Sequence, residues 1–546
     1  MLLLYFTIFT SVTSRHISPE GWGQAQPTFP RLMNATIESL TVGLESKLFS
    51  SVDLVIAYAR RIAEVNSTLN VVTELNPDAL EIAKQLDLER SNGKSRGVLH
   101  GIPILIKNNI ATMDRMNNTA GSWALVGAKV PRDSTMARKL REAGAIILGK
   151  TNLSQWANFR SQNSSNGWSA YGGQVYAAYY PKQDPSGSSS GSGVASSLGL
   201  ALGSLGTETD GSIVSPAEKN NLVGIKPTVG LTSRALVIPI SEHQDSIGPM
   251  TRTVKDAAYI LQAIAGIDPA DNYTSAIPGK IRNYLKACNP LALSGAKIGI
   301  PRNVISLTGT KGSPELIAFE KALTTMRNAG ADVVVSNFTS ASAQLMSQGE
   351  IQVLNADFIV NLASYLAQLT SNPTNVKSLS DVRQFTQSFP LEEYPSRDTK
   401  IWDQALFTQK WNNTDPRFWK AYQQNLKYSS DGGLLDVISR QKLDAVILPT
   451  SIASSWAATV GAPIITVPLG FYPLNAPVKK NTRGNLVASG PNVPFGLSFL
   501  GAKWTEEKLI GLAYAFEQKT LVRNMVQPYL VPKTEIADVV KKGRHS

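Results

Sequence analysis

The sequence of 546 residues contains a single cysteine, Cys288, and only four histidines. One cysteine cannot form a disulfide within the chain, and it provides no cysteine cluster for a structural metal ion. The histidines, His16, His100, His243 and His545, are spread along the chain without the spacing of a metal motif. The sequence therefore shows no Cys/His metal cluster, and we expect chemistry without a metal or another cofactor. It also leaves His100 and His243 as the two histidines that a Ser-His-Asp triad would have to use.

Long apolar runs are also missing. The longest candidate, MLLLYFTIFTSVTS at residues 1–14, is shorter than the ~20 residues that a membrane-spanning helix needs. Small residues precede Arg15, so the run predicts a signal peptide that is cut there, although no basic side chain precedes it. The alternative is a buried or frayed terminus. We therefore expect a secreted protein without an integral membrane span.

Secretion would expose N-glycosylation sequons to the glycosylation machinery. They include triplets that begin at Asn34, Asn66, Asn117, Asn163, Asn272, Asn337 and Asn412. A chain this rich in serine and threonine also contains such triplets by chance, so the sequence predicts a glycoprotein only together with the signal peptide.

The net charge of +12 is not concentrated in one region. Basic residues gather only in the C-terminal tail 536–546, and no recognised nucleic-acid motif accompanies them. We therefore expect no nucleic-acid partner.

Apolar strands alternate with amphipathic helices along most of the chain. The pattern predicts a helix that begins at and is capped by Ser51, with Arg61 off its apolar face. It also predicts buried strands at residues 102–106 and 145–148, and residues 345–440 have a mostly helical pattern. Strands that are apolar throughout and lie between helices indicate an α/β layered sheet.

Two polar, glycine-rich stretches, PSGSSSGSGVASS at 185–197 and GTETDGSIVSPA at 206–217, flank a run of small apolar residues. The run at 194–205 suits a buried helix. Glycine allows the backbone to approach a ligand closely, and the serines provide hydroxyl groups.

Two catalytic patterns match as text but fail in context. GAIILGKT at 144–151 has the spacing of a phosphate-binding loop, but its middle four residues have the character of a strand. GSSSG at 187–191 has the spacing of a nucleophile elbow, but a polar, proline-containing segment precedes it where a strand is required. Ser189 is therefore a poor candidate for an elbow nucleophile.

A third possibility is a serine nucleophile with a lysine base. Lys107 follows the buried strand at 102–106, and burial there would lower its pKa enough to supply a neutral amine. A lone lysine after a strand is more often a solvated surface charge. Other motifs must decide between these interpretations.

Three motifs favour the interpretation of Lys107 as a base over that of a surface charge. HGIPILIKNNI from His100, GKTNLSQWANFR from Gly149 and the stretch at 185–217 occur in the order and spacing of the amidase signature family, which the chain resembles. The resemblance implies one large domain, residues 15–535, with a central mixed and twisted β-sheet covered by helices on both faces. Within the family, the chain looks most like the peptide amidase branch and its fungal relatives.

The resemblance also implies a Ser-Ser-Lys triad. Ser212 would be the nucleophile, and Ser188, which sits on a cis peptide bond in this family, would relay its proton to neutral Lys107. The oxyanion hole would consist of the backbone N–H groups of Thr209, Asp210, Gly211 and Ser212.

Ser189 and Asn108 would support the triad. Two positions depart from the common family pattern. Asn108 replaces an aspartate, which puts the pH profile in doubt, and Asp210 replaces a glycine, where we expect only its backbone to contribute.

The expected function is hydrolysis of a carboxamide C–N bond through an acyl-serine intermediate. The substrate would be a peptide C-terminal amide or a small amide, and the sequence does not specify the oligomeric state. Two alternatives remain: the amide-cleaving subunit of an amidotransferase, and a catalytically silent binding protein on the same fold.

Overall fold

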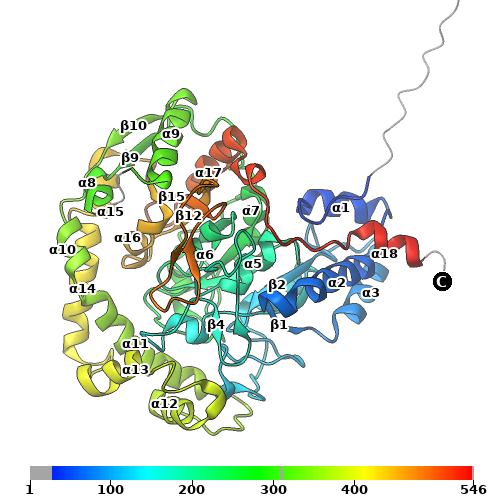
Figure 1. The fold of residues 1–546 in the computed structure, drawn as a ribbon, viewed down its shortest axis with the longest axis horizontal. Coiled ribbons are helices and arrows are strands. Elements are labelled where there is room, and N and C mark those ends of the chain that lie inside the picture. The colour runs from blue at the N-terminus through cyan, green and yellow to red at the C-terminus, as the bar shows by residue number, and fades with distance from the viewer. Residues whose placement is uncertain (1–27, 308–311, 544–546) are drawn as a thin grey trace, which may run out of the picture.

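A single large sheet organises the chain, which the computed structural model describes over residues 28–307 and 312–543. The expected signal peptide lies outside these ranges. Eleven strands pair in the order β1-β3-β2-β6-β8-β7-β12-β15-β11-β9-β10 (Figure 1). Their bounds are β1 Val72–Leu75, β2 Pro103–Lys107, β3 Ile146–Thr151, β6 Ser204–Glu208, β7 Val223–Lys226, β8 Ser246–Thr251, β9 Lys297–Ile300, β10 Asp332–Val335, β11 Ala445–Pro449, β12 Ile464–Phe471 and β15 Pro494–Leu500.

The sheet is mixed. β3, β2 and β6 run parallel near one end, where the edge strand β1 pairs antiparallel with β3. β11, β9 and β10 run parallel at the other end. Between these groups, β6, β8, β7, β12, β15 and β11 pair antiparallel. Two small hairpins lie outside the sheet and pair β4 Trp168–Ser169 with β5 Gly173–Gln174, and β13 Lys479–Lys480 with β14 Val487–Ser489.

Helices cover both faces of the sheet, as the resemblance to the amidase signature family implies. α5 and α6 pack against each other and against the strands β2, β6, β7 and β15. α7, α17 and α9 form another packed group, which contacts β8, β12 and β15. The helices are α1 Ile37–Glu45, α2 Ser51–Leu69, α3 Ala79–Ser91, α4 Thr135–Glu142, α5 Ser190–Ser197, α6 Val214–Lys219, α7 Val254–Ile264, α8 Arg302–Leu307, α9 Pro314–Asn328, α10 Ala341–Met346, α11 Gly349–Leu366, α12 Leu379–Ser388, α13 Lys400–Asp403, α14 Pro416–Ser430, α15 Leu434–Gln441, α16 Ser454–Ala458, α17 Glu506–Thr520 and α18 Ile536–Gly543.

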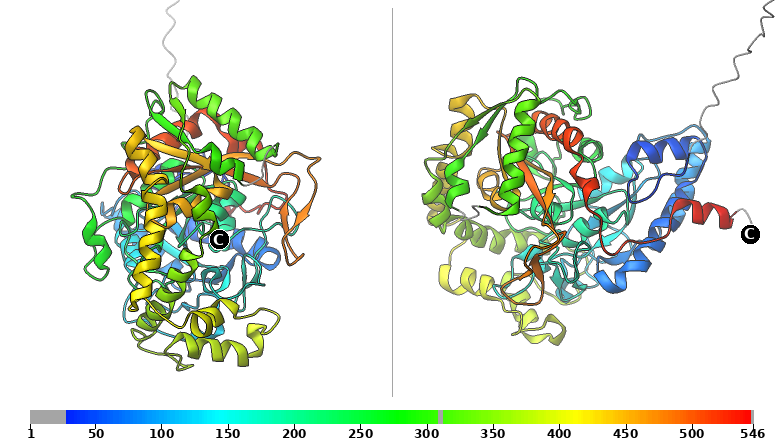
Figure 2. Two further views of the ribbon diagram at one scale, coloured as in Figure 1. Left: turned by 90° about the vertical axis from the view of Figure 1, so that its left-hand side faces the viewer. Right: turned by 45° about the horizontal axis from the view of Figure 1, so that its top comes forward.

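The mostly helical pattern of residues 345–440 corresponds to α11–α15. These helices lie at the end of the molecule opposite α2 and α3 in Figure 1 and in the right-hand view of Figure 2. α11 carries Phe358, which is buried against Phe159 in a second apolar cluster that also contains Trp402. This cluster fixes the helical region against the loops that follow β2 and β3.

Two local expectations are wrong. The cap of α2 is Ser50, whose side chain accepts from the N–H of Asp53 while Asp53 accepts from the Ser50 N–H, so the helix begins one residue after its cap. The apolar run at 194–205 is not one helix, because α5 ends at Ser197 and β6 begins at Ser204. Gly199 has a left-handed φ of +57° between them, which allows the chain to turn back into the sheet.

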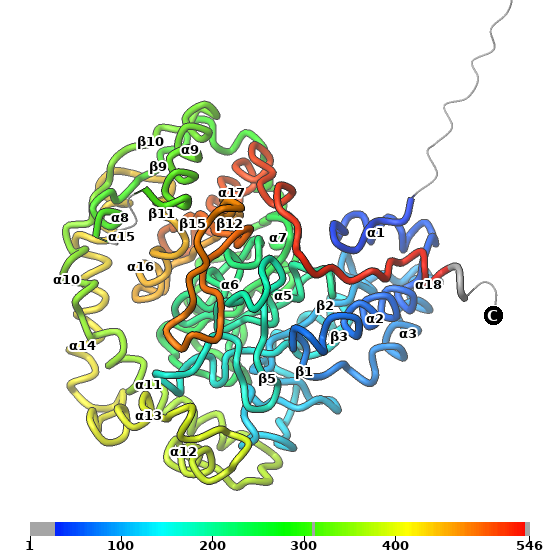
Figure 3. The backbone as a smooth tube through the Cα atoms, viewed as in Figure 1, coloured from blue at the N-terminus to red at the C-terminus, as the bar shows by residue number. Residues whose placement is uncertain are grey.

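The C-terminal segment, expected as a basic tail, includes α18, which packs against α2 (Figure 3). Ile536 and Val539 of α18 are buried in the main core. Arg61 of α2 is also fully buried, contrary to the polar face expected for it. Its guanidinium donates to the carbonyl oxygens of Leu198, Gly199, Pro532 and Thr534.

Arg61→Ala should therefore lower the free energy of unfolding by about 2–4 kcal/mol, because it leaves several buried carbonyl groups without a donor. Urea denaturation measures the effect. Arg60→Ala is the matched control, since Arg60 neighbours Arg61 on α2 but is exposed. Equal stability of the two variants would contradict the importance of the Arg61 contacts.

In the ranges that the structure describes, no helix is both long enough and apolar enough to cross a bilayer.

Candidate active site

The motif residues meet where two parallel strands end. β2 and β6 are neighbours, with Leu105 opposite Ser204 and Ile106 opposite Leu205. β2 ends at Lys107, and β6 runs into the loop Thr209–Ser212, which we call the nucleophile loop. The carboxyl ends of parallel strands meet at one edge of a sheet, so this topology brings the lysine and the loop together.

Lys107 is fully buried, and its amine contacts one of the motif serines. Its Nζ donates to Ser188 Oγ at 2.8 Å and to Thr207 Oγ1 at 2.9 Å and the Thr207 carbonyl oxygen at 3.2 Å. Burial lowers the pKa of Lys107 to about 7, against the opposing charges of Asp245 and Glu208. A large fraction of the amine is therefore neutral near pH 7, and it can then accept a proton along its contact with Ser188.

Ser188 and Ser189 lie directly before α5. The Gly187–Ser188 peptide is cis, and the Ser188 side chain is fully buried. Ser189 holds this segment against β6, because its Oγ donates to the Thr207 carbonyl at 3.1 Å and accepts from the Thr207 N–H at 3.2 Å. The Ser189 N–H also donates to the carbonyl oxygen of Ser212 at 3.1 Å, which places the two serine segments side by side.

Ser212 is in the nucleophile loop and is 8% exposed. Its hydroxyl has no hydrogen-bond partner within residues 28–307 and 312–543. The same holds, over those residues, for the N–H groups of Thr209, Asp210, Gly211 and Ser212. A free hydroxyl beside free N–H donors is the arrangement that acyl transfer requires.

Neighbouring side chains hold the nucleophile loop in shape. Gly211 has a φ of +80°, a left-handed conformation that favours glycine. Glu208 Oε2 accepts from the N–H groups of Ile213 and Val214 at 2.7 and 2.9 Å. Thr209 Oγ1 donates to Asp245 Oδ1 at 2.6 Å. The loop is therefore fixed at both ends by carboxylates.

Asn108 takes part in the local structure, and its side chain is hydrogen-bonded away from the Lys107 amine. Its Oδ1 accepts from the N–H of Thr119 at 2.9 Å, and its Nδ2 donates to Thr73 Oγ1 at 2.8 Å. Asn109 is closer to Lys107, since its Nδ2 donates at 3.0 Å to the same Thr207 hydroxyl that Lys107 contacts.

A cavity of about 340 Å³ borders the nucleophile loop. Gln344, Glu350, Tyr428, Ser454 and Ser455 line it, together with apolar side chains. Ser455 Oγ donates to Asp210 Oδ2 at 2.6 Å, and a Cβ atom added to Gly211 would lie 3.2 Å from Ser454 Oγ. The wall of this cavity therefore touches the loop that carries Ser212.

Comparison with known proteins places the chain in a family. The amidase family model matches residues 53–510, most of the chain. The chain belongs to the amidase family. It is accordingly an enzyme that hydrolyses amide C–N bonds.

Relatives of several kinds support this assignment. A protein of Arthroderma benhamiae that is named an amidase by similarity is 55% identical over 537 residues, which cover 94% of this chain and 90% of that protein. The X-ray structure of the native peptide amidase from Stenotrophomonas maltophilia is 38% identical, with a TM-score of 0.80 over 92% of this chain and 99% of that chain. A glutamyl-tRNA(Gln) amidotransferase subunit of Moorella thermoacetica is 30% identical over 89% of this chain and 96% of that protein.

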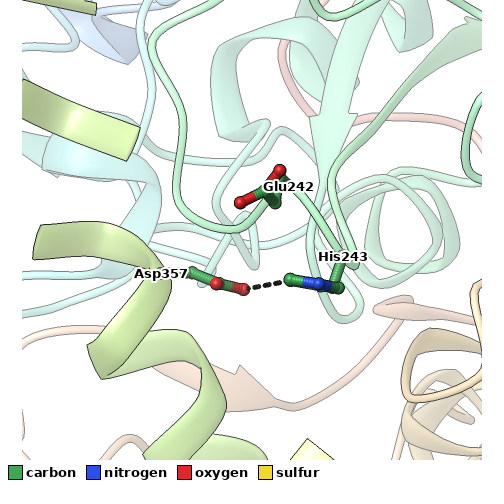
Figure 4. A group of neighbouring side chains, drawn as sticks. All are labelled: Glu242, His243 and Asp357. Atoms are coloured by element: carbon green, nitrogen blue, oxygen red, sulfur yellow. Dashed lines mark hydrogen bonds and ion pairs between the residues drawn. The ribbon is translucent and has the colours of Figure 1, made fainter. Parts of the chain in front are cut away.

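Neither histidine considered for a serine-histidine mechanism contacts Lys107, Ser188 or Ser212. His100 contacts the carbonyl oxygen of Leu86 through Nε2 at 2.8 Å and accepts from the N–H of Arg96. His243 Nδ1 lies 2.8 Å from Asp357 Oδ2. The dashed line in Figure 4 marks this contact. Both are structural contacts.

Glu242, His243 and Asp357 form the group of potential metal ligands found in the described part of the chain (Figure 4). Asn413 Nδ2 donates to Glu242 Oε1 and to Asp357 Oδ1, both at 3.0 Å, and Ser241 Oγ donates to Asp357 Oδ2 at 2.6 Å. These hydrogen bonds engage Glu242 Oε1 and both carboxylate oxygen atoms of Asp357. The group therefore connects the segment after β7 to α11 and to the loop before α14.

Several residues that contact the site were missed from the sequence. Thr207 is two residues before the nucleophile loop and shares a face of β6 with Leu205, but this strand is buried throughout and gives no alternation that could have indicated it. Gln244 and Asp245 contact Thr209 from a segment that carries no motif. Only the three-dimensional arrangement shows their role.

Proposed function

We propose that the enzyme cleaves carboxamides through an acyl-Ser212 intermediate, with Ser188 and Lys107 as the proton path. The observation that carries the proposal is the contact of 2.8 Å between the Lys107 amine and the Ser188 hydroxyl at a fully buried position. Because burial lowers the pKa of Lys107 to about 7, this amine can be a base where an exposed lysine could not.

In the acylation step, Ser212 Oγ attacks the substrate carbonyl carbon while its proton passes to Ser188 Oγ, and the Ser188 proton passes to Lys107 Nζ. The resulting oxyanion would accept hydrogen bonds from the free N–H groups of the nucleophile loop. The protonated lysine returns the proton through Ser188 to the leaving nitrogen, and the C–N bond breaks. Water then hydrolyses the acyl-Ser212 ester by the same proton path, which releases the carboxylic acid and restores the enzyme.

We propose a peptide C-terminal amide or a small amide as the substrate. Similarity to the S. maltophilia peptide amidase over almost its full length supports this choice, as does a cavity beside the nucleophile loop with both polar and apolar walls.

On this proposal, an N-acetylated peptide amide should give a kcat/KM at least about tenfold higher than a long-chain fatty amide or an aryl amide. Ammonia release from a panel of the three classes, measured with the purified protein, tests this expectation. Ser212→Ala protein is the control for contaminating amidases. A preference for fatty amides would contradict the proposed substrate class.

The amidotransferase alternative is supported by the relative from M. thermoacetica, which is 30% identical. It requires partner subunits, so ammonia release by the isolated chain from peptide amides at a steady rate would count against it. A silent binding protein would fail to react with a fluorophosphonate probe, whereas the proposed enzyme becomes labelled at Ser212.

We also propose secretion, on the basis of the apolar residues 1–14. Expression of the full chain in a eukaryotic host should place the protein in the medium with residues 1–14 removed and some sequons glycosylated. Intact-mass measurement before and after enzymatic deglycosylation decides this, and retention of an uncleaved protein inside the cell would contradict it.

A further inference from the structure

Asp210, where many members of the family have glycine, uses its side chain as well as its backbone. Asp210 Oδ2 accepts from Ser455 Oγ at 2.6 Å. Asp210 Oδ1 is buried and has no donor among the described residues when every carboxyl group is ionised. The carboxyl group beside it is that of Glu350, near the start of α11. A proton on Glu350 would therefore satisfy the buried oxygen of Asp210.

Glu350 reaches the nucleophile loop by a second path through Gln244. Gln244 Nε2 donates to Glu350 Oε1 at 2.8 Å and to the carbonyl oxygen of Thr209 at 3.3 Å. The side-chain amide of Gln244 therefore joins Glu350 to Thr209, the first residue of the loop. Asp210, which lies beside Glu350, is the second residue of the same loop. Both contacts come from α11, which is more than 130 residues away in the sequence.

We propose that Glu350 is a positioning residue that holds the oxyanion-binding N–H groups in place, by sharing one proton with Asp210 and by accepting from Gln244. The proposal rests on the function proposed for the nucleophile loop. It gives the side chain of Asp210 a role that a glycine at that position could not have.

The electrostatics of the site agree with this geometry. Burial, followed by the negative charge of Asp210, raises the pKa of Glu350 to about 8. The other groups packed around it add little compensating charge: Tyr428 and Asn425 face the same cavity from α14, Ser454 and Ser455 face it from α16, and Gln344 faces it from α10. Asp210 also interacts with the charges of Glu208 and Lys226, and Asp245 is hydrogen-bonded to Thr209.

The sign of the pH effect follows from this arrangement. Below about pH 8 the pair holds one proton, and the loop has its hydrogen bonds. Above that pH Glu350 ionises, two adjacent carboxylates repel each other, and the N–H donors of the loop are displaced. Activity should therefore fall on the alkaline side, separately from its rise on the acid side as Lys107 becomes neutral.

Glu350→Gln and Glu350→Ala separate two effects of Glu350. The glutamine removes the titrating proton but keeps the hydrogen bonds, and the alanine removes both. The glutamine can donate to Asp210 with its Nε2 and accept from Gln244 with its Oε1 at every pH. We expect it to retain kcat within about threefold at pH 7 and to lose the alkaline fall, whereas Glu350→Ala should lower kcat about 100-fold with little change in KM, because a small displacement of catalytic groups costs that much.

The measurement is the pH profile of kcat and KM for a substrate without a titrating group in this range, such as an N-acetylated peptide amide. Glu315→Gln is the matched control. Glu315 accepts from Ser451 on the wall of the same cavity, at 2.7 Å, and this hydrogen bond does not involve the nucleophile loop. The Glu315→Gln variant should keep the alkaline fall of the unmodified enzyme.

An alkaline fall that persists in Glu350→Gln would overturn the proposal, as would an increase in KM at unchanged kcat in Glu350→Ala. If the alanine variant does not fold, the glutamine profile decides alone. Failure of the proposed function looks different, because the unmodified enzyme would then not be labelled at Ser212 by a fluorophosphonate, whatever the profile of the Glu350 variants.

Discussion

Lys107→Arg lowers kcat/KM on a carboxamide by about 1,000-fold or more at every pH, if Lys107 is the base. Arginine keeps the positive charge but cannot supply a neutral amine, so it cannot take the proton that Ser188 would pass on. In the unmodified enzyme, kcat/KM should rise with pH and level off near the lysine pKa of about 7, because only the deprotonated lysine is active. A steady-state pH series on both proteins measures the difference.

Lys150 provides the matched control for this prediction. It lies on the neighbouring strand β3, is fully buried, and also has its pKa lowered to about 7 by burial. Its Nζ donates to Asn118 Oδ1 at 2.8 Å and does not contact Ser188. Lys150→Met should therefore lower stability and leave kcat of the folded enzyme within about threefold of the original value. Near-normal turnover in a folded Lys107→Arg enzyme would return Lys107 to a structural role.

Ser212→Ala should abolish acylation and lower kcat by about 1,000-fold or more, and Ser188→Ala should cause a loss of similar order. If the two hydroxyls belong to one proton path, as proposed, the double variant should be little worse than either single variant. Kinetics of the three variants, with circular dichroism to verify folding, test this relation.

Ser189→Ala is the control for the serine series. Ser189 is adjacent to Ser188 and equally buried, but among the described residues its hydroxyl is hydrogen-bonded only to the backbone of Thr207. Its loss should lower the free energy of unfolding by about 1–2 kcal/mol and leave the proton path intact. If the effects of Ser188→Ala and Ser212→Ala multiply independently, the relay through Ser188 is wrong.

Local patterns predict the parts of the fold that are uniformly apolar. The strand β2 was evident because it is buried on both faces and its residues form a continuous apolar run. The helix α2 was evident because it is buried on one face and its apolar residues recur with the helical period. The central strands β6, β7 and β8 were missed. Their glycine, serine and threonine residues resemble a loop, and they are strands because long-range pairing with their neighbours stabilises them.

The site likewise has a part that local sequence patterns predict and a part that they do not. A buried strand that ends in Lys107 indicates a lysine with a lowered pKa, but the identity of its partner came only from the resemblance to a family. The contact between Asp210 and Glu350 could not be predicted, because no spacing rule connects a loop after β6 with α11. Cap positions such as Ser50 also depend on backbone angles that adjacent serines leave undetermined.

The most direct test of the central claim is to find the acyl group on the chain. The purified enzyme is mixed with a slowly hydrolysed amide, quenched in acid within a second, digested and mapped by mass spectrometry. We expect the mass of the acyl group, without the leaving amine, on the peptide that contains Ser212, and its loss on treatment with hydroxylamine. An adduct on a peptide that contains His100 or His243 instead, or turnover of the Ser212→Ala enzyme at the normal rate, would contradict the account.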